Sequence, residues 1–290
     1  PEIILTRDIT VRSERFIEAD LVYYPSGACA FVLSWNHILL DAKGTTLLFE
    51  HLNHISENKP YNFDIFFPAK EKATGIITHV QNMYKVKKFV QTSSRPPVYS
   101  IADAGTKHSD ERTMNKIISF TVDETEIIST NAVRSGSRFG PTLYFIACCS
   151  HAIHLLNRQK NKPGDLWLPV PYDGRLKGAA GPLISNCVSF LSKDELSNVP
   201  QTVKCLSEQM KAQIKDHIPQ KYTMFLNMMR HIPLWLYYFL ISRTGRGVFA
   251  SFLHTSTGDN FNELKSLFGE PLSKLTMTPA LTFPPGLTFV

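Results

Sequence analysis

The sequence predicts an α/β protein made of two halves joined by a linker. In the first half, an almost continuously apolar run at 28–35 leads into a helical pattern at 45–55, as expected of a buried strand followed by a helix. Residues 91–114 are polar and carry Pro and Gly signals, which is typical of a linker. A second series of strand and helix patterns follows it. We therefore expect an N-terminal half at 1–100 and a C-terminal half at 113–290.

The N-terminal half is expected to begin with strands. Apolar residues recur between 2 and 24, and Pro25-Ser26-Gly27 is a turn signal before the central strand. In the following helix, apolar residues of 47–55 share one face. Residues 56–75 lose this periodicity and predict a loop, whereas 76–89 favours a helix.

The C-terminal half opens on a predicted strand at 117–122. Asp123 is expected to cap a helix that ends at Arg134, with Glu126 as its capping-box partner. A long apolar helix is predicted at 143–156. The remaining predicted elements are strands at 167–171, 186–191 and 248–255, a helix at 200–216 and an extended tail at 281–290.

The composition is that of an ordinary globular protein with a proper core, at 290 residues, 43% apolar and 19% charged. The net charge of +6 is scattered in short clusters, which disfavours a nucleic-acid groove and suits anionic partners such as a phosphorylated cofactor, an acidic carrier protein or a membrane surface. The chain starts at Pro1 without a secretory signal pattern, so a cytoplasmic protein is expected. Reduced, buried thiols are expected at Cys29, Cys148, Cys149, Cys187 and Cys205.

His37 is the candidate catalytic residue, because it lies at the strand-to-helix turn, four residues before Asp41. Histidine titrates near neutral pH and serves as a general base when one ring nitrogen is held and the other is open. A tight turn lets one nitrogen donate to a nearby backbone carbonyl. Asp41 is expected to form an ion pair or to cap the helix, where an acid also complements the helix dipole. The pattern predicts His37 as the base of an acyl transfer.

Other chemistry is less well supported by the sequence. An HxxxD pattern alone is weak, since a lone histidine in an apolar region is usually part of a core. A metal site is not expected, because no third ligand lies near His37 and Asp41. The sequence contains no GxSxG elbow, phosphate loop or dinucleotide fingerprint. The remaining histidines considered have no comparable setting, namely His51, His54, His108, His151, His154, His217 and His231.

The segment from Asn36 to Ala42 resembles the HHxxxDG motif of the CoA-dependent acyltransferase superfamily. This superfamily includes chloramphenicol acetyltransferase, nonribosomal peptide condensation domains, wax ester synthase/diacylglycerol acyltransferases and plant-type alcohol acyltransferases. His37 and Asp41 match the motif, whereas Asn36 replaces its first histidine and Ala42 its glycine. Members with a single histidine are active. Gly44 is expected to supply the freedom of the turn.

Three further segments resemble the family more weakly, namely 139–143, 169–175 and 284–287. The resemblance implies two chloramphenicol acetyltransferase-like subdomains, each a mixed β-sheet with helices, with an active-site tunnel between them. Because family domains are longer, the chain is expected to be truncated at both ends. The family's aspartate often pairs with an arginine, for which Arg175 is the candidate, and Asn186 is expected to be a structural hydrogen-bonding residue near the site.

The resemblance also implies the reaction. His37 takes the proton of a hydroxyl or amine acceptor, which attacks an acyl thioester carried by CoA or by an acyl-carrier protein, without a permanently bound cofactor or metal. The oxyanion needs a donor. The candidates are the hydroxyl residues Ser251, Thr255, Ser256 and Thr257.

Two alternatives remain open at this point. Asn36 in place of the first histidine allows a non-catalytic, condensation-like module that binds a carrier protein or a lipid. The apolar stretch at 224–241 is too short and too interrupted to span a bilayer. It predicts a helix packed on the core, a wall of an acyl-chain tunnel, or an interfacial helix with peripheral membrane contact. The anchors of such an interfacial helix would be Trp235, Tyr237, Tyr238 and Arg243.

Overall fold

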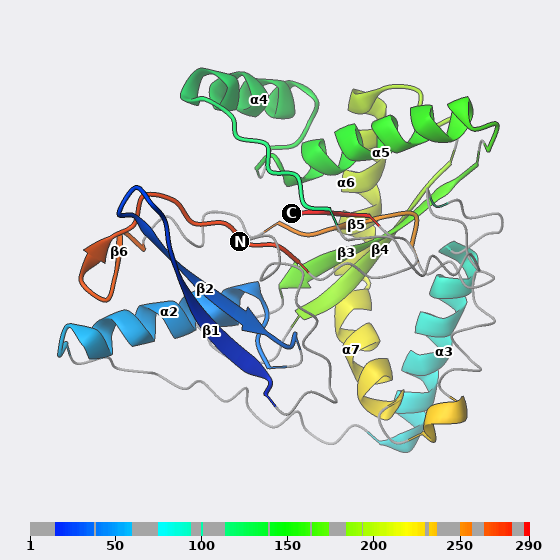
Figure 1. Ribbon diagram of the computed structural model, residues 1–290. Coiled ribbons are helices and arrows are strands. Elements are labelled where there is room, and N and C mark those ends of the chain that lie inside the picture. Colours follow the sequence, from blue (N-terminus) through cyan, green and yellow to red (C-terminus); the bar gives the residue numbers. More distant parts are fainter. Residues whose placement is uncertain are drawn as a thin grey trace. The chain divides into compact units, whose positions relative to one another are not determined.

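The computed structural model describes residues 15–37, 39–59, 75–93, 100, 114–138, 140–162, 164–173, 184–192, 194–229, 232–236, 250–256, 264–279 and 287–290 (Figure 1). The described residues divide into two compact units. Unit 1 takes those of Pro1–Phe66, Arg112–Asn115 and Thr257–Thr278, and unit 2 takes those of Phe67–Glu111, Lys116–Ser256 and Pro279–Val290. Both units contain strands and helices, so the α/β class predicted from the sequence is confirmed.

Unit 1 is built on an antiparallel hairpin of β1 (Ile17–Tyr23) and β2 (Cys29–Trp35). Gly27 takes a left-handed backbone, φ 82°, and its N–H donates to the Tyr24 carbonyl at 3.0 Å, which closes the predicted turn. The Asn36 N–H donates to the Phe16 carbonyl at 2.8 Å. This bond continues the ladder one residue past β2 and fixes where the turn that follows begins.

Helix α2 (Ala42–Ser56) contacts the hairpin through aromatic rings. Phe31 of β2 meets Phe49 of α2 edge-on at 6.1 Å between ring centroids, and it meets Phe268 in the same way at 5.6 Å. Phe268 lies in the tight turn between β6 (Ser266–Leu267) and β7 (Glu270–Pro271). Its N–H donates to Oδ1 of Asn53 at 2.9 Å, so a C-terminal segment of the chain is attached to α2.

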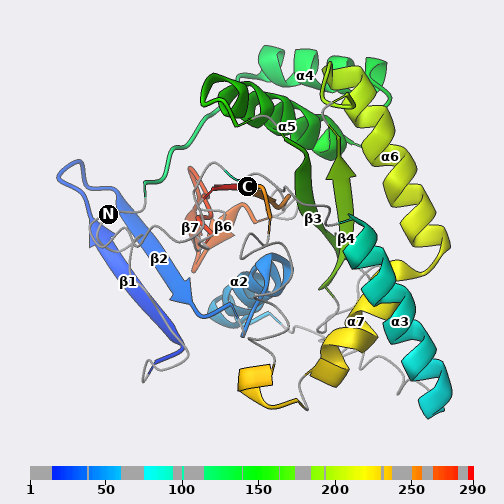
Figure 2. The same ribbon diagram turned by 90° about the vertical axis from the view of Figure 1, so that its right-hand side faces the viewer.

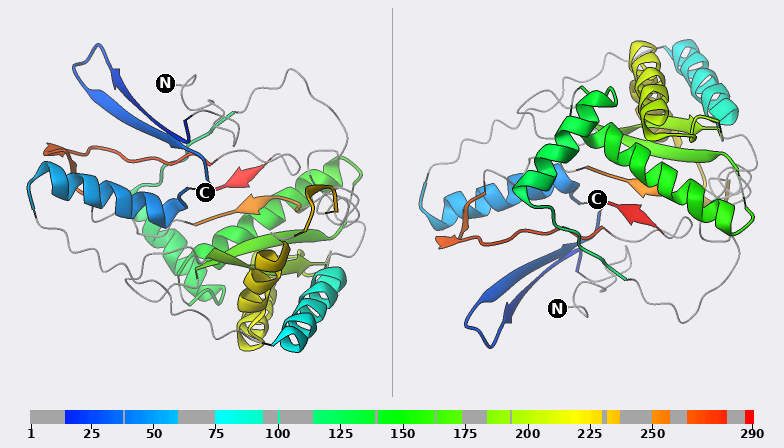
Figure 3. Two further views of the ribbon diagram at one scale, coloured as in Figure 1. Left: turned by 90° about the horizontal axis from the view of Figure 1, so that it is seen from below. Right: turned by 90° about the horizontal axis from the view of Figure 1, so that it is seen from above.

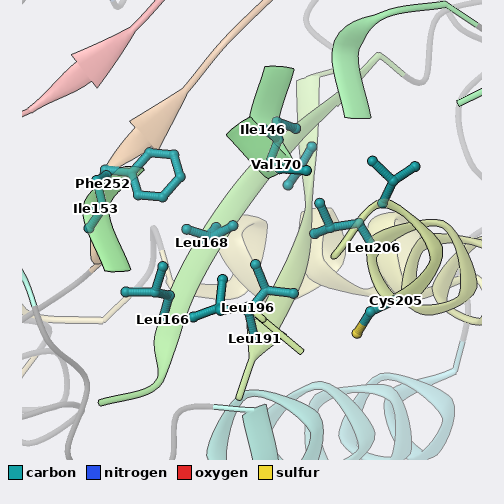
Figure 4. Close-up of a cluster of buried hydrophobic side chains, with 12 residues drawn as sticks. Ile146, Ile153, Leu166, Leu168, Val170, Leu191, Leu196, Cys205, Leu206 and Phe252 are labelled. Atoms are coloured by element: carbon teal, nitrogen blue, oxygen red, sulfur yellow. The ribbon is translucent and has the colours of Figure 1, made fainter. Parts of the chain in front are cut away.

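Unit 2 has its core between an antiparallel strand pair and two helices. The strands are β3 (Leu166–Asp173) and β4 (Ile184–Leu191), and the helices are α5 (Thr142–Gln159) and α6 (Val199–Lys215). Alternate residues of β3 share one face, and Figure 4 shows Leu168 among Leu166, Val170 and side chains of the helices. The core residues are fully or almost fully buried: Ile146, Ala147, Ile153, Leu166, Leu168, Val170, Leu191, Leu196, Val203, Cys205, Leu206 and Phe252.

Two further helices and one short strand pair complete unit 2. Helix α3 (Ile76–Ser93) lies alongside α7 (Ile218–Met229), and both contact β4 (Figures 2 and 3). Strand β5 (Leu253–His254) pairs in parallel with β8 (Thr288–Phe289). Val86 of α3 is buried, at 1% exposed. The boundaries of the two predicted halves stay a prediction, because most of the interval 91–114 lies outside the described residues.

The start of α4 (Val122–Arg134) differs from the sequence prediction. Residues 114–120 form neither strand nor helix, so the strand predicted at 117–122 is wrong. The cap is Thr121 and its partner is Glu124, not Asp123 and Glu126. The Glu124 N–H donates to the Thr121 hydroxyl at 3.2 Å, and the Thr121 N–H donates to the Glu124 carboxylate at 2.7 Å. The Thr121 hydroxyl also lies 3.0 Å from the Glu124 carboxylate, and the bonds that this carboxylate accepts from the Thr121 N–H and hydroxyl lower the pKa of Glu124.

Other predicted elements have clear outcomes. Helices α5 and α6 and strands β3 and β4 match the predicted ones within a few residues. The strand predicted at 248–255 appears in the described residues only as β5. Of the apolar stretch at 224–241, α7 contains the beginning, and Trp235, 70% exposed, lies in a short helical turn. No helix in the described part of the chain is long and apolar enough to cross a membrane.

The cysteines are free where their side chains are described. Cys205 is buried, and Cys148 and Cys149 are partly buried. Burial raises the pKa of Cys149 to about 12. Cys29 is exposed at the start of β2, so the expected burial is wrong for this residue. The predicted strands before residue 15 and the loop at 60–74 lie outside the described residues.

The capping box of α4 gives a testable prediction. Thr121→Ala removes the side chain that accepts the Glu124 N–H, and we expect it to destabilise the helix by about 1 kcal/mol. Hydrogen exchange of the α4 amides should then quicken. Asp123→Ala is the matched control, since Asp123 only complements the helix dipole and its removal should cost a few tenths of a kcal/mol. Equal effects of the two variants would contradict the assigned cap.

Candidate active site

The candidate site is the turn between β2 and α2. Trp35 is the last residue of β2, and Asp41 is the residue before α2. The Leu39 N–H donates to the Asn36 carbonyl at 3.0 Å, which closes a tight turn around His37.

The Leu40 carbonyl holds the His37 side chain. Its oxygen lies 3.0 Å from His37 Nδ1 and 3.0 Å from Trp35 Nε1. A carbonyl oxygen only accepts hydrogen bonds, so Nδ1 carries the ring proton in this arrangement. In the neutral ring Nε2 is then the acceptor. His37 is exposed, and its Nε2 has no hydrogen bond to any residue in the described part of the chain.

Asp41 is the N-cap of α2. Its backbone is extended, with φ −90° and ψ 179°, and its Oδ1 accepts the Gly44 N–H at 2.7 Å. The Asp41 carbonyl accepts both the N–H and the hydroxyl of Thr45, each at 2.9 Å. Of the two functions that the sequence allowed, the helix cap is therefore present. A carboxylate at this end also complements the helix dipole.

Gly44 contributes space instead of an unusual backbone angle. It lies in the first turn of α2, where any residue adopts the backbone conformation. A Cβ atom at this position would lie 3.2 Å from Asp41 Oδ1 and 3.4 Å from Leu40 Cδ2. The absence of a side chain therefore permits the short capping bond. Ala42 at the motif's glycine position is the first residue of α2, which suits a residue with a side chain.

Asn36 and His37 differ in their surroundings although they are neighbours. Asn36 is buried, at 8% exposure, and its N–H belongs to the hairpin ladder. His37 is exposed on the turn. Asn36 is thus part of the hairpin, whereas the His37 side chain is exposed on the turn.

Three of the four predicted oxyanion donors, Ser251, Thr255 and Ser256, belong to unit 2, whereas His37 belongs to unit 1. Ser251 is fully buried, its hydroxyl accepts the Trp167 N–H at 3.0 Å, and its own N–H donates to the Trp167 carbonyl at 2.8 Å. This double bridge attaches Ser251 to β3. Thr255 is partly buried with its N–H bonded to Phe289, and Ser256 is exposed. Their function at the site stays a prediction.

Three further predicted residues cannot be placed in the site. Thr257 and Arg175 lie outside the described residues, so the expected pairing of Asp41 with Arg175 is a prediction only. Asn186 pairs with Pro171 across the β3–β4 ladder, but its side chain lies outside the described residues. Within the described part of the chain, no group of three or more His, Cys, Asp or Glu residues is arranged to hold a metal ion.

His254 is a buried histidine that the sequence analysis did not single out. It is 8% exposed in β5, and burial lowers its pKa from 6.5 to about 4. The imidazole is consequently neutral at physiological pH. The sequence signal was its place two residues after Phe252, because alternate residues of a strand share a face.

Comparison with known proteins gives structural neighbours only. No family model matches the chain, and no curated protein matches it. Among solved structures it is similar to condensation domains.

One such neighbour is the first condensation domain of the calcium-dependent antibiotic synthetase in complex with a substrate analogue. It is 15% identical with a TM-score of 0.49, over 70% of this chain and 46% of that chain. A second structure of the first condensation domain of the CDA synthetase is 13% identical with a TM-score of 0.48, over 83% and 50% of the two chains. The chain thus spans about half the length of these condensation-domain chains.

The helix cap formed by Asp41 is expected to stabilise the folded protein. We expect Asp41→Ala to lower the free energy of unfolding by about 1 kcal/mol, because the Gly44 N–H loses its acceptor. Asp41→Asn keeps a side-chain oxygen and should cost much less. Urea unfolding followed by tryptophan fluorescence measures both. A loss in Asp41→Asn as large as in Asp41→Ala would show that the cap is not what Asp41 contributes.

His254 predicts a pH dependence of stability. Between about pH 6.5 and 4 the unfolded chain binds a proton at this histidine and the folded chain does not, so stability falls as the pH falls through this window. The shift corresponds to about 3 kcal/mol by the bottom of the window. Thermal unfolding of the parent and of His254→Leu across this range tests it. The variant should show a flatter pH dependence, and parallel curves would refute the prediction.

Proposed function

We propose that this chain carries the general base of an acyltransferase, which moves an acyl group from a thioester to a hydroxyl or amine. The observation that carries the proposal is the orientation of His37. Its Nδ1 donates to the Leu40 carbonyl at 3.0 Å, and its exposed Nε2 is the acceptor. A general base needs this arrangement, because the nitrogen that receives the proton must have its lone pair available and directed outward.

The proposed reaction proceeds by direct transfer. His37 Nε2 takes the proton of the acceptor O–H or N–H as the acceptor atom bonds to the thioester carbon. The tetrahedral intermediate then breaks its C–S bond, and the imidazolium returns the proton to the leaving thiolate. The products are an ester or amide and a free thiol, and His37 regains its starting protonation state. No covalent bond to the enzyme forms.

Each neighbour of His37 has a defined task in this proposal. The Leu40 carbonyl stabilises the imidazolium through Nδ1–H. Asp41 caps α2 and so fixes the first turn of the helix that follows Leu40. The oxyanion requires a separate donor. Thr255, Ser256 and Thr257 are the proposed candidates, because the buried bridge between Ser251 and Trp167 favours a structural function for Ser251.

The proposed donor is acyl-CoA or a phosphopantetheinyl thioester on a carrier protein. Both carry phosphate groups, and the net charge of +6 favours the approach of anionic partners. The thioester is a co-substrate in this scheme, and no permanently bound cofactor is required.

Removal of the His37 imidazole tests the proposal. We expect His37→Gln to lower kcat by roughly 10²–10⁴-fold with little change in binding of the thioester, because the imidazole acts on proton transfer in the transition state. Release of free thiol from a panel of acyl-CoA donors and alcohol or amine acceptors measures it in the full chain. His151→Gln is the matched control, since His151 Nδ1 also bonds a carbonyl, that of Leu196 at 3.1 Å.

The alternative function makes the opposite prediction. A non-catalytic, condensation-like module would bind a carrier protein or lipid without releasing thiol, and His37→Gln would not change that binding. Acyl transfer by the parent that survives in His37→Gln would reject His37 as the base.

A further inference from the structure

The Leu40 carbonyl is unusual in having two side-chain donors on one oxygen. Trp35 Nε1 and His37 Nδ1 both lie 3.0 Å from it. The first intrahelical bond of α2 is made to the carbonyl of Asp41, so the Leu40 carbonyl lies just outside the helix. Its orientation is therefore set by the turn and by these two side chains, and not by the helix ladder.

Trp35 is the fixed member of this pair of donors. It is partly buried at the end of β2, opposite Ile17 in the hairpin register. His37 is exposed on the turn and is held through its ring nitrogen. The indole N–H therefore anchors the carbonyl from the side of the hairpin, and the carbonyl in turn orients the imidazole.

We infer that Trp35 is a positioning residue that selects the Nδ1–H tautomer of His37 through the Leu40 carbonyl. A free histidine side chain prefers the Nε2–H tautomer, which places the proton on the nitrogen that must act as the base. An acceptor fixed opposite Nδ1 reverses this preference. The catalytic consequence rests on the function proposed above, whereas the tautomer itself does not.

Nitrogen NMR of histidine-labelled protein tests the inference directly. Two-bond proton–nitrogen correlations, recorded where the ring is neutral, distinguish the tautomers, and the His37 signals are assigned by their absence in His37→Gln. We expect the Nδ1–H tautomer in the parent and a shift toward Nε2–H in Trp35→Phe, which lacks the indole N–H. An Nε2–H parent, or an unchanged tautomer in Trp35→Phe, would overturn the inference.

Two further variants separate positioning from packing. Replacement of Trp35 by benzothienylalanine exchanges the indole N–H for sulfur and keeps the shape, so it should shift the tautomer as Trp35→Phe does while the hairpin stays folded. Trp235→Phe is the control for loss of a tryptophan, because Trp235 is 70% exposed and lies in unit 2. It should leave the His37 tautomer unchanged.

Kinetics complete the test. If His37 is the base, Trp35→Phe should lower kcat about tenfold with an unchanged KM, a part of the roughly 10²–10⁴-fold that a positioned base supplies. A parent with the Nδ1–H tautomer but no acyl transfer would reject the proposed function and leave the positioning of His37 intact. Full kcat in a variant whose tautomer has shifted would reject the catalytic consequence assigned to Trp35.

Discussion

The hydrogen bond from the Gly44 N–H to the Asp41 carboxylate is the constraint on which the candidate site depends. At 2.7 Å it defines the first turn of α2, and with it the direction in which the chain leaves the turn. The other end of the turn is fixed by the bond from Asn36 to Phe16 in the hairpin. Between these two ends, the Leu40 carbonyl lies within reach of two side chains, those of Trp35 and His37.

Much of this architecture could be predicted from the sequence, because the signals are local and strong. The local hydrophobic pattern predicts one type of element in each of three places. These are the apolar run of β2, the apolar face of α2 and the long apolar stretch of α5. The acid at position 41 indicated a helix start, and a cap is present there. Such features depend on residues a few positions apart, so they can be predicted without knowledge of the tertiary contacts.

Other features could not be predicted from the sequence, for physical reasons. At the start of α4 two overlapping patterns compete, Thr121 with Glu124 and Asp123 with Glu126, and only the backbone geometry decides between them. The segment at 114–120 has a strand-like composition but no strand in the structure, since strand formation needs a partner. The orientation of the Leu40 carbonyl is a property of the backbone, and the burial of His254 depends on pairing with residues near the end of the chain.

The attachment of Phe268 to Asn53 has a consequence for how the chain folds. The contact joins residues 215 positions apart, so α2 and the hairpin acquire their aromatic partner only after the long segment between Asn53 and Phe268 has been made. Loop closure over such a distance is entropically costly and slow compared with formation of the hairpin. During synthesis, Phe31 therefore lacks this ring contact until Phe268 has been made. This interval is when the nascent chain is most prone to aggregation.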